Sequence, residues 1–97
     1  MMDDMEIYDV NLSPQAKKDL RVVPQHIRDK FQGWVKTVEK EGLREVQKTP
    51  GYHDEPLKGK RKGQRSIRLN RAYRAIYVIK GKEIELVWVE EVTHHEY

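Results

Sequence analysis

The sequence of 97 residues predicts a single α+β domain, in which a strand and a helical hairpin precede a three-stranded antiparallel meander. Two observations predict this order. Apolar residues recur at helical spacing in the first half of the chain, whereas apolar and polar residues alternate in the manner of β-strands from about residue 64 onward. Because helices segregated from an antiparallel sheet define an α+β architecture, we expect two layers, with the helices on one face of the sheet.

The N-terminal part predicts a short strand followed by a short helix. Apolar residues recur between positions 5 and 12, which favours a strand that ends before Ser13. Serine followed by proline is a common helix start, with Ser13 as the N-cap and Pro14 at the first helical position. We therefore expect an amphipathic helix over residues 14–21.

A second helix is predicted from Pro24 to Gly42, which stands where a C-terminal cap belongs. Its apolar residues fall on one helical face: Ile27, Phe31, Trp34, Val35 and Val38. Leu43 and Val46 favour one further turn of helix. The helices over residues 14–21 and from Pro24 onward are expected to form a hairpin that lies on the sheet.

Residues 43–63 otherwise form a long connector, interrupted by Pro50-Gly51 and Pro56. Loops of this length in a compact domain are often functional. Three strands are predicted after it, over residues 64–69, 72–79 and 83–89, with tight turns at Asn70-Arg71 and around Gly81. The segment 90–97 is expected to leave the sheet.

Positive charge is concentrated in the stretch 57–82, which contains ten basic residues and no acid. The flanks are acidic, since residues 1–55 carry nine bases and eleven acids and residues 83–97 carry five acids and no Lys or Arg. Such a concentration is typical of a surface that binds a polyanion, most often a nucleic acid. A solvated basic face that is paired with the acidic flanks is the alternative. The phosphate-binding candidates in the connector and the first strand after it are Lys58, Lys60, Arg61, Lys62 and Arg65.

Strand alternation places Arg68 and Arg74 on the same side of the predicted hairpin. Two guanidinium groups on one surface can hold a phosphate and stabilise the charge that develops on it. The alternative is that each arginine pairs with an acid of the neighbouring strand: Glu83, Glu85, Glu90 or Glu91.

His94 and His95 are the best candidates for general acid or base, because the reference pKa of histidine is nearest to neutrality. Adjacent histidines can equally be solvated surface or a weak metal site. His26 and His53 are isolated, and are expected on a helix surface and in a loop. RNA cleavage needs a base for the 2′-OH, cations for the phosphorane and an acid for the leaving oxygen, so Arg, Lys and His suffice without a metal or another cofactor.

The composition excludes several classes of protein. The chain has no cysteine, which rules out disulfides and thiolate metal sites. Because it has only four histidines, a dedicated metal site is not expected. No run of about 18 apolar residues exists, and the N-terminus is acidic, unlike a signal peptide. We therefore expect a cytoplasmic protein that has no contact with the membrane.

The string LKGKRKGQRSIRLNRAYRAIYV, followed by a strand and HHEY, resembles the RelE/HigB-like toxins of bacterial type II toxin–antitoxin modules. The resemblance covers nearly the whole chain and implies a RelE-like two-layer fold. It also implies a ribosome-dependent mRNA endoribonuclease that contacts 16S rRNA and is silenced by a cognate antitoxin. The basic loop of the family matches Lys58, Lys60 and Arg61, its strand arginines match Arg68 and Arg74, and its C-terminal histidine and aromatic match His94 or His95 and Tyr97.

Two other functions are compatible with this resemblance. ParE-like toxins share the fold and inhibit DNA gyrase by binding, and a relative that binds RNA without cleaving it is a further option. The ParE branch generally lacks a catalytic histidine at the chain end. The sequence HHEY therefore favours RNA cleavage.

Overall fold

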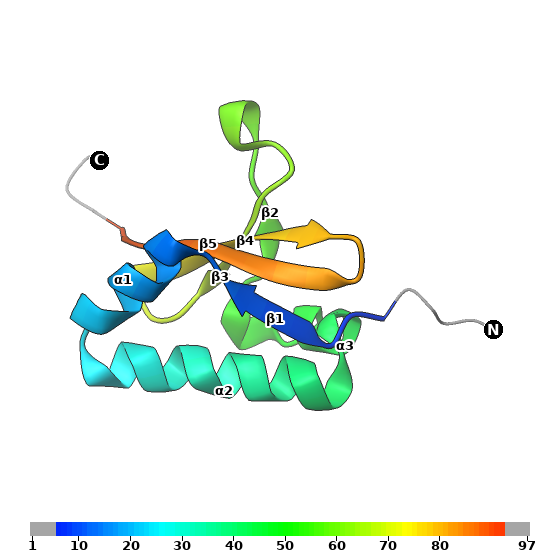
Figure 1. The fold of residues 1–97 in the computed structure, drawn as a ribbon, viewed down its shortest axis with the longest axis horizontal. Coiled ribbons are helices and arrows are strands. Elements are labelled where there is room, and N and C mark those ends of the chain that lie inside the picture. Colours follow the sequence, from blue (N-terminus) through cyan, green and yellow to red (C-terminus); the bar gives the residue numbers. More distant parts are fainter. Residues whose placement is uncertain (1–5, 93–97) are drawn as a thin grey trace.

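The structure, a computed structural model, describes residues 6–92 and contains a five-stranded sheet in the order β1-β5-β4-β3-β2 (Figure 1). The strands are β1 (Asp9–Leu12), β2 (Glu55–Pro56), β3 (Arg65–Arg68), β4 (Tyr73–Lys80) and β5 (Glu83–Glu91). The helices are α1 (Pro14–Val22), α2 (Gln25–Glu41) and α3 (Leu43–Gln47), with the 3₁₀ turns η1 (Pro50–Tyr52) and η2 (Gly59–Arg61). The predicted α+β class, the helices and the β3-β4-β5 meander are confirmed.

The sheet is mixed, which the sequence did not predict. β1 pairs with β5 in parallel, with Val10 opposite Ile84, whereas all other neighbours are antiparallel. β1 is also shorter than the strand expected over residues 5–12. β2 adds an edge strand of two residues inside the connector, where Pro56 had argued against regular structure.

Ser13 connects the start of α1 to the sheet. Its Oγ accepts a 3.0 Å hydrogen bond from the backbone N–H of Ala16, as expected for an N-cap, and its hydroxyl donates a 2.6 Å bond to the carbonyl of Val87 in β5. Pro14 occupies the first turn, where its missing N–H leaves no donor unpaired. The cap therefore also fixes the point at which the chain passes from the sheet into α1.

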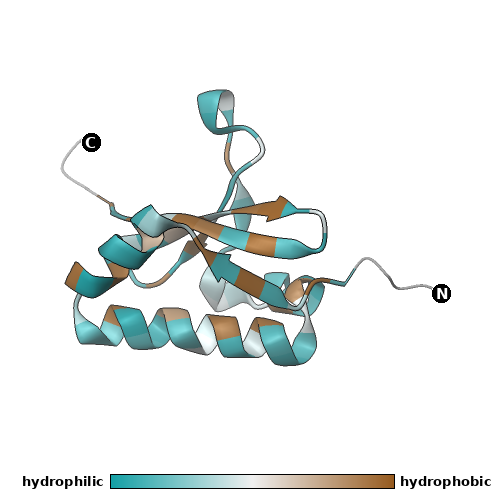
Figure 2. Ribbon diagram, in the orientation of Figure 1, coloured by the Kyte–Doolittle hydropathy of each residue, from teal (hydrophilic) through white to brown (hydrophobic). Residues whose placement is uncertain are grey.

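The core lies between the helices and one face of the sheet. The predicted face of α2 buries Ile27, Phe31, Trp34 and Val38, and the ring of Trp34 lies 5.5 Å from that of Tyr77 in β4. In Figure 2, hydrophobic and hydrophilic residues alternate along α2 and along β5, as expected for elements with one buried face. The opposite face of β3, β4 and β5, here called the polar face, carries Arg68, Arg74 and Glu90 beside Ile76 and Trp88.

Gly42 forms the junction between α2 and α3. Its φ of 92° is a left-handed value that glycine adopts without strain, and its N–H bonds to the carbonyl of Val38 at 2.8 Å. The side chain of Glu6 occupies the space where a Cβ would project, and its Oε1 accepts a hydrogen bond from Arg44 N at 2.9 Å. The segment before β1 is thereby fixed against the end of α2.

Residues 57–63, here called the basic arm, rise from the sheet on the side away from α2 (Figure 1). The arm contains η2 and two glycines with positive φ, Gly59 and Gly63. It therefore projects from the polar face of the sheet.

Within residues 6–92, no helix has the length and apolar character that crossing a membrane requires.

Candidate phosphate-binding site

Arg68 and Arg74 are directly opposite each other in the β3-β4 ladder. Residues opposite each other in an antiparallel pair point to the same side of the sheet, so the predicted common face is confirmed. Their neighbours Ile67 and Ala75 are fully buried on the helix side. The two arginines therefore lie on the polar face, from which the basic arm also rises.

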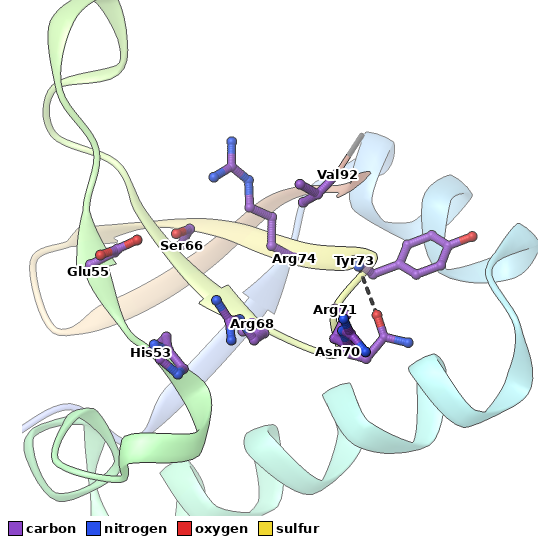
Figure 3. A pocket seen from close by; sticks show the side chains of 9 residues that line it. All are labelled: His53, Glu55, Ser66, Arg68, Asn70, Arg71, Tyr73, Arg74 and Val92. Atoms are coloured by element: carbon purple, nitrogen blue, oxygen red, sulfur yellow. Dashed lines mark hydrogen bonds between the residues drawn. The ribbon is translucent and has the colours of Figure 1, made fainter. Parts of the chain in front are cut away.

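Both arginines line a shallow pocket of about 120 Å³ (Figure 3). The pocket lies on the polar face, where β2, β3, β4 and the end of β5 come together. Its lining residues are His53, Glu55, Ser66, Arg68, Asn70, Arg71, Tyr73, Arg74 and Val92. The volume and the three arginines suit a compact anion, such as one phosphate group, better than a large apolar ligand.

The two arginines are held differently. Arg74 Nε donates a 2.5 Å hydrogen bond to Glu90 Oε2. For Arg74, the alternative prediction of an ion pair with an acid of the neighbouring strand is therefore confirmed. Its terminal nitrogens form no hydrogen bond within residues 6–92. Arg68 is exposed and forms no ion pair with any described residue. Both guanidinium groups therefore retain donors for an anion.

Glu90 joins the pocket to the basic arm. Besides Arg74, its carboxylate accepts hydrogen bonds from Arg61 Nη2 at 2.9 Å and from Trp88 Nε1 at 2.7 Å. The Arg61 guanidinium also lies 4.9 Å from the Trp88 ring centroid. Burial by itself raises the pKa of Glu90, but these three donors outweigh it and lower the pKa to about 2. Glu90 is therefore ionised near neutral pH and is a poor proton acceptor.

Two further pocket residues can transfer protons, and the sequence analysis did not select them. Glu55 faces Ser66 across β2 and β3, and His53 lies just before β2 at the pocket wall (Figure 3). His53 adopts the left-handed conformation, with φ of 45°. Such backbone is uncommon for a non-glycine residue and recurs at functional sites. Their position in a long, proline-interrupted loop was the one available signal.

The turn between β3 and β4 is held by Asn70. Its Oδ1 accepts hydrogen bonds from the backbone N–H groups of Ala72 and Tyr73, at 2.7 and 2.9 Å. This side-chain bonding takes the place of the glycine that tight hairpins favour, and the loop is wider than the predicted two-residue turn. The width places Asn70 and Arg71 at the pocket rim.

The predicted phosphate-binding residues fall into three groups. Lys58, Lys60 and Lys62 are exposed on the basic arm, and no described acid forms an ion pair with them. Arg61 is turned back toward Trp88 and Glu90. Arg65 lies on the opposite face of β3 from Arg68, where its Nε bonds to the buried carboxylate of Asp54 at 2.7 Å. Arg65 is therefore not part of the pocket.

His94, His95 and Tyr97 lie outside the residues that the structure describes. Val92, which lines the pocket, bonds through its N–H to the carbonyl of Ala72 at 2.6 Å. Within residues 6–92, no group of three His, Asp or Glu side chains is arranged to hold a metal ion.

The sequence profile of the ParE toxin of the type II toxin–antitoxin system parDE matches residues 10–96 of the chain. None of the curated proteins matches the chain. The match includes both arginine-bearing strands and most of the C-terminal segment.

Solved structures of similar fold come from several bacterial toxins. YafQ from Escherichia coli strain BL21(DE3) is 20% identical, with a TM-score of 0.70, over 86% of this chain and 91% of that chain. The structure of YoeB dimer from Staphylococcus aureus is 19% identical, with a TM-score of 0.66, over 89% and 97%. A chain of the toxin–antitoxin complex RelBE2 from Mycobacterium tuberculosis has the same identity and TM-score, over 89% and 99%. These similarities extend over nearly the whole fold.

Proposed function

The chain belongs to the ParE toxin family of type II toxin–antitoxin systems, within the RelE/ParE superfamily, and among the activities of toxins with this fold we propose that it is an endoribonuclease that cleaves mRNA on the ribosome. The observation that carries the proposal is the pocket in which Arg68 and Arg74 face the same surface beside Glu55 and His53. A toxin that acts only by binding a protein does not require an anion pocket with adjacent acid–base groups.

The pocket contains the groups that metal-independent RNA cleavage requires. The scissile phosphate is placed between Arg68 and Arg74, whose charges stabilise the dianionic phosphorane. A base removes the proton of the 2′-OH as this oxygen attacks phosphorus, and an acid protonates the departing 5′-oxygen. The products are a 2′,3′-cyclic phosphate and a 5′-OH. Glu55 is the proposed base within the described residues, because its carboxylate lies in the pocket and belongs to no ion pair among residues 6–92.

The proposed acid is a histidine. His53 lies at the pocket wall, and His94 follows the pocket residue Val92 by two positions, which is at most about 7 Å of extended chain. Tyr97 is proposed to assist the histidine pair of the C-terminal segment. The Lys58–Lys62 stretch of the basic arm is proposed to bind RNA phosphates on either side of the cleaved bond, with 16S rRNA as a further contact.

The proposed partner that silences the toxin is a cognate antitoxin. The E. coli DinJ–YafQ structure and the RelBE2 structure are toxin–antitoxin complexes of proteins with this fold. An acidic segment of the antitoxin would complement the basic arm and the arginines of the pocket, and would exclude RNA phosphates from them.

Inhibition of DNA gyrase is the second candidate function, and the match to the ParE profile favours it. One experiment separates the two functions. Purified protein is added to ribosomes programmed with an mRNA, and separately to gyrase in a supercoiling assay, with Arg68→Ala/Arg74→Ala as the paired control. We expect new mRNA 5′-OH ends with the wild-type protein and none with the control. Intact mRNA together with blocked supercoiling would reject the endoribonuclease in favour of the gyrase inhibitor.

A further inference from the structure

Asp54 lies between the two pocket residues His53 and Glu55, but its side chain points the other way. The carboxylate is 1% exposed, whereas both neighbours are exposed. Tyr52, on the other side of His53, is also turned inward and packs against the core. Along residues 52–55, inward anchors and outward pocket residues therefore alternate.

The Asp54 carboxylate accepts hydrogen bonds from two side chains, which belong to two different strands. Arg65 Nε of β3 donates to Oδ1 at 2.7 Å, and the Tyr77 hydroxyl of β4 donates to Oδ2 at 2.6 Å. Gln47 of α3 donates to the Tyr77 oxygen at 3.2 Å. Burial, and then the charge of Asp54, raise the pKa of Tyr77, so the phenol keeps its proton and remains a donor.

The strands that hold Asp54 on the helix side are the strands that carry the arginines on the polar side. Arg65 precedes Arg68 on β3, and Tyr77 follows Arg74 on β4. Because the carboxylate accepts one short hydrogen bond from each strand, both the position and the orientation of the Asp54 side chain are fixed relative to β3 and β4. The position of the Glu55 backbone is therefore fixed relative to the two strands that carry Arg68 and Arg74.

We propose that Asp54 is a positioning residue, which sets the proton-transfer side chains of residues 53 and 55 against the two phosphate-binding arginines through its contacts with Arg65 and Tyr77. This inference rests on the proposed endoribonuclease function. A displacement of about 1 Å in a reacting group lowers a rate by about 100-fold. A merely structural network would instead lower stability and leave the rate of the folded protein unchanged.

Tyr77→Phe is the most selective test, because it removes one anchor of Asp54 and keeps the ring that packs on Trp34. We expect a 10- to 100-fold lower single-turnover rate of cleavage of ribosome-bound mRNA, with unchanged affinity for the ribosome. Ile27→Val, in the core at α2, is the control for lost stability without a change at Asp54. An equal rate loss in both variants would overturn the proposal.

A double-mutant cycle makes the test sharper. In a His53→Gln/Glu55→Gln background, Tyr77→Phe should cost little further activity, because both side chains that it misplaces are already replaced. The loss in melting temperature caused by Tyr77→Phe should be the same in both backgrounds. Rate losses that multiply independently would overturn the positioning role.

A second readout does not depend on catalysis. In Tyr77→Phe the NMR imidazole resonances of His53 should shift, whereas those of His26, exposed on α2, should not. If the wild-type protein cleaves no mRNA, the proposed function fails, and unchanged His53 resonances would then reject the positioning of the loop separately. Asp54→Asn should reproduce the His53 shift, provided that the variant folds.

Discussion

Arg74 and Glu90 face each other across β4 and β5, and the Arg74 Nε donates a 2.5 Å hydrogen bond to the Glu90 carboxylate. The bond uses one of the five guanidinium donors and restricts the side chain before any ligand arrives. Because the same carboxylate also accepts from Arg61, the three side chains keep a net charge of +1. Arg74 is therefore preorganised without being neutralised.

Replacing Arg74 should remove one preorganised donor from the transition state. For Arg74→Ala we expect cleavage of ribosome-bound mRNA to fall by about 100-fold or more, as for other lost charge donors. Arg74→Lys should recover only part of this loss, because an ammonium group cannot bond to Glu90 and a phosphate in the same fork geometry. Arg21→Ala, on the exposed side of α1, is the control. Wild-type cleavage by folded Arg74→Ala protein would contradict the role.

The contribution of Glu90 to the stability of the fold should be lost at acid pH. The pKa of Glu90 lies at about 2 in the folded protein, against an ordinary value of 4.5. A lowered pKa means that its contribution to stability is complete above about pH 4.5 and is lost as the pH falls toward 2. The difference in melting temperature between wild type and Glu90→Gln should therefore shrink from pH 5 to pH 2.5. A difference that is constant across this range would refute the assignment.

Binding of the protein to single-stranded RNA should weaken with salt. If about five cations contact phosphates, log K should fall with log salt with a slope of roughly −3 to −4. Changing the arm residues Lys58, Lys60 and Lys62 to Gln should make the slope less negative by about 2. The matched control changes three exposed helix lysines, Lys17, Lys36 and Lys40, to Gln. Equal slopes for the two triple variants would show that the basic arm does not bind RNA.

The C-terminal histidines can be tested by truncation. A protein that ends at Thr93 should fold, because residues 6–92 contain all strands of the sheet, but should cleave mRNA 10²- to 10⁴-fold more slowly. His94→Gln and His95→Gln, tested singly, then identify which histidine acts, and we expect the larger loss for His94→Gln. Wild-type cleavage by the truncated protein would transfer the acid role to His53.

Two glycines of the helical layer should respond in opposite ways to alanine. Gly42→Ala forces a side chain into left-handed backbone and against Glu6, and should lower the free energy of unfolding by at least about 1–2 kcal/mol. Gly33→Ala lies inside α2, where an added Cβ meets nothing within 4 Å, and should raise it by up to about 1 kcal/mol. Urea denaturation of both variants measures this difference. A stabilised Gly42→Ala protein would contradict the structure at that junction.

The elements that the sequence predicted correctly have local signals. Ser13-Pro14 is a cap signal within one turn, and the spacing from Ile27 to Val38 reports the buried face of α2 directly. The common face of Arg68 and Arg74 follows from alternation and a short turn. The parallel pairing of β1 with β5 carries no such signal, since its register joins residues more than 70 positions apart.

The site was predicted only in part, for the same reason. Arg65 belongs to the same charged stretch as Arg68, and only the strand phase and the buried partner Asp54 show that it faces the other side. Glu90 pairs with Arg61 and Arg74 from 29 and 16 positions away, so the sequence could name it only as one of four acids available to pair with an arginine of the neighbouring strand. His53 and Glu55 enter the pocket through the edge strand β2, which is too short to leave a pattern.

The position of β5 between β1 and β4 has a consequence for synthesis of the protein in the cell. Among the described strands, β1 leaves the ribosome first and its partner β5 leaves last, while the chain grows at about 5–20 residues per second. Until β5 emerges, β1 has no neighbouring strand, Arg74 lacks Glu90, and one edge of β4 has no hydrogen-bonding partner. The pocket therefore forms only after β5 has been synthesised, so nascent chains that end before this strand lack the site that we propose to cleave RNA.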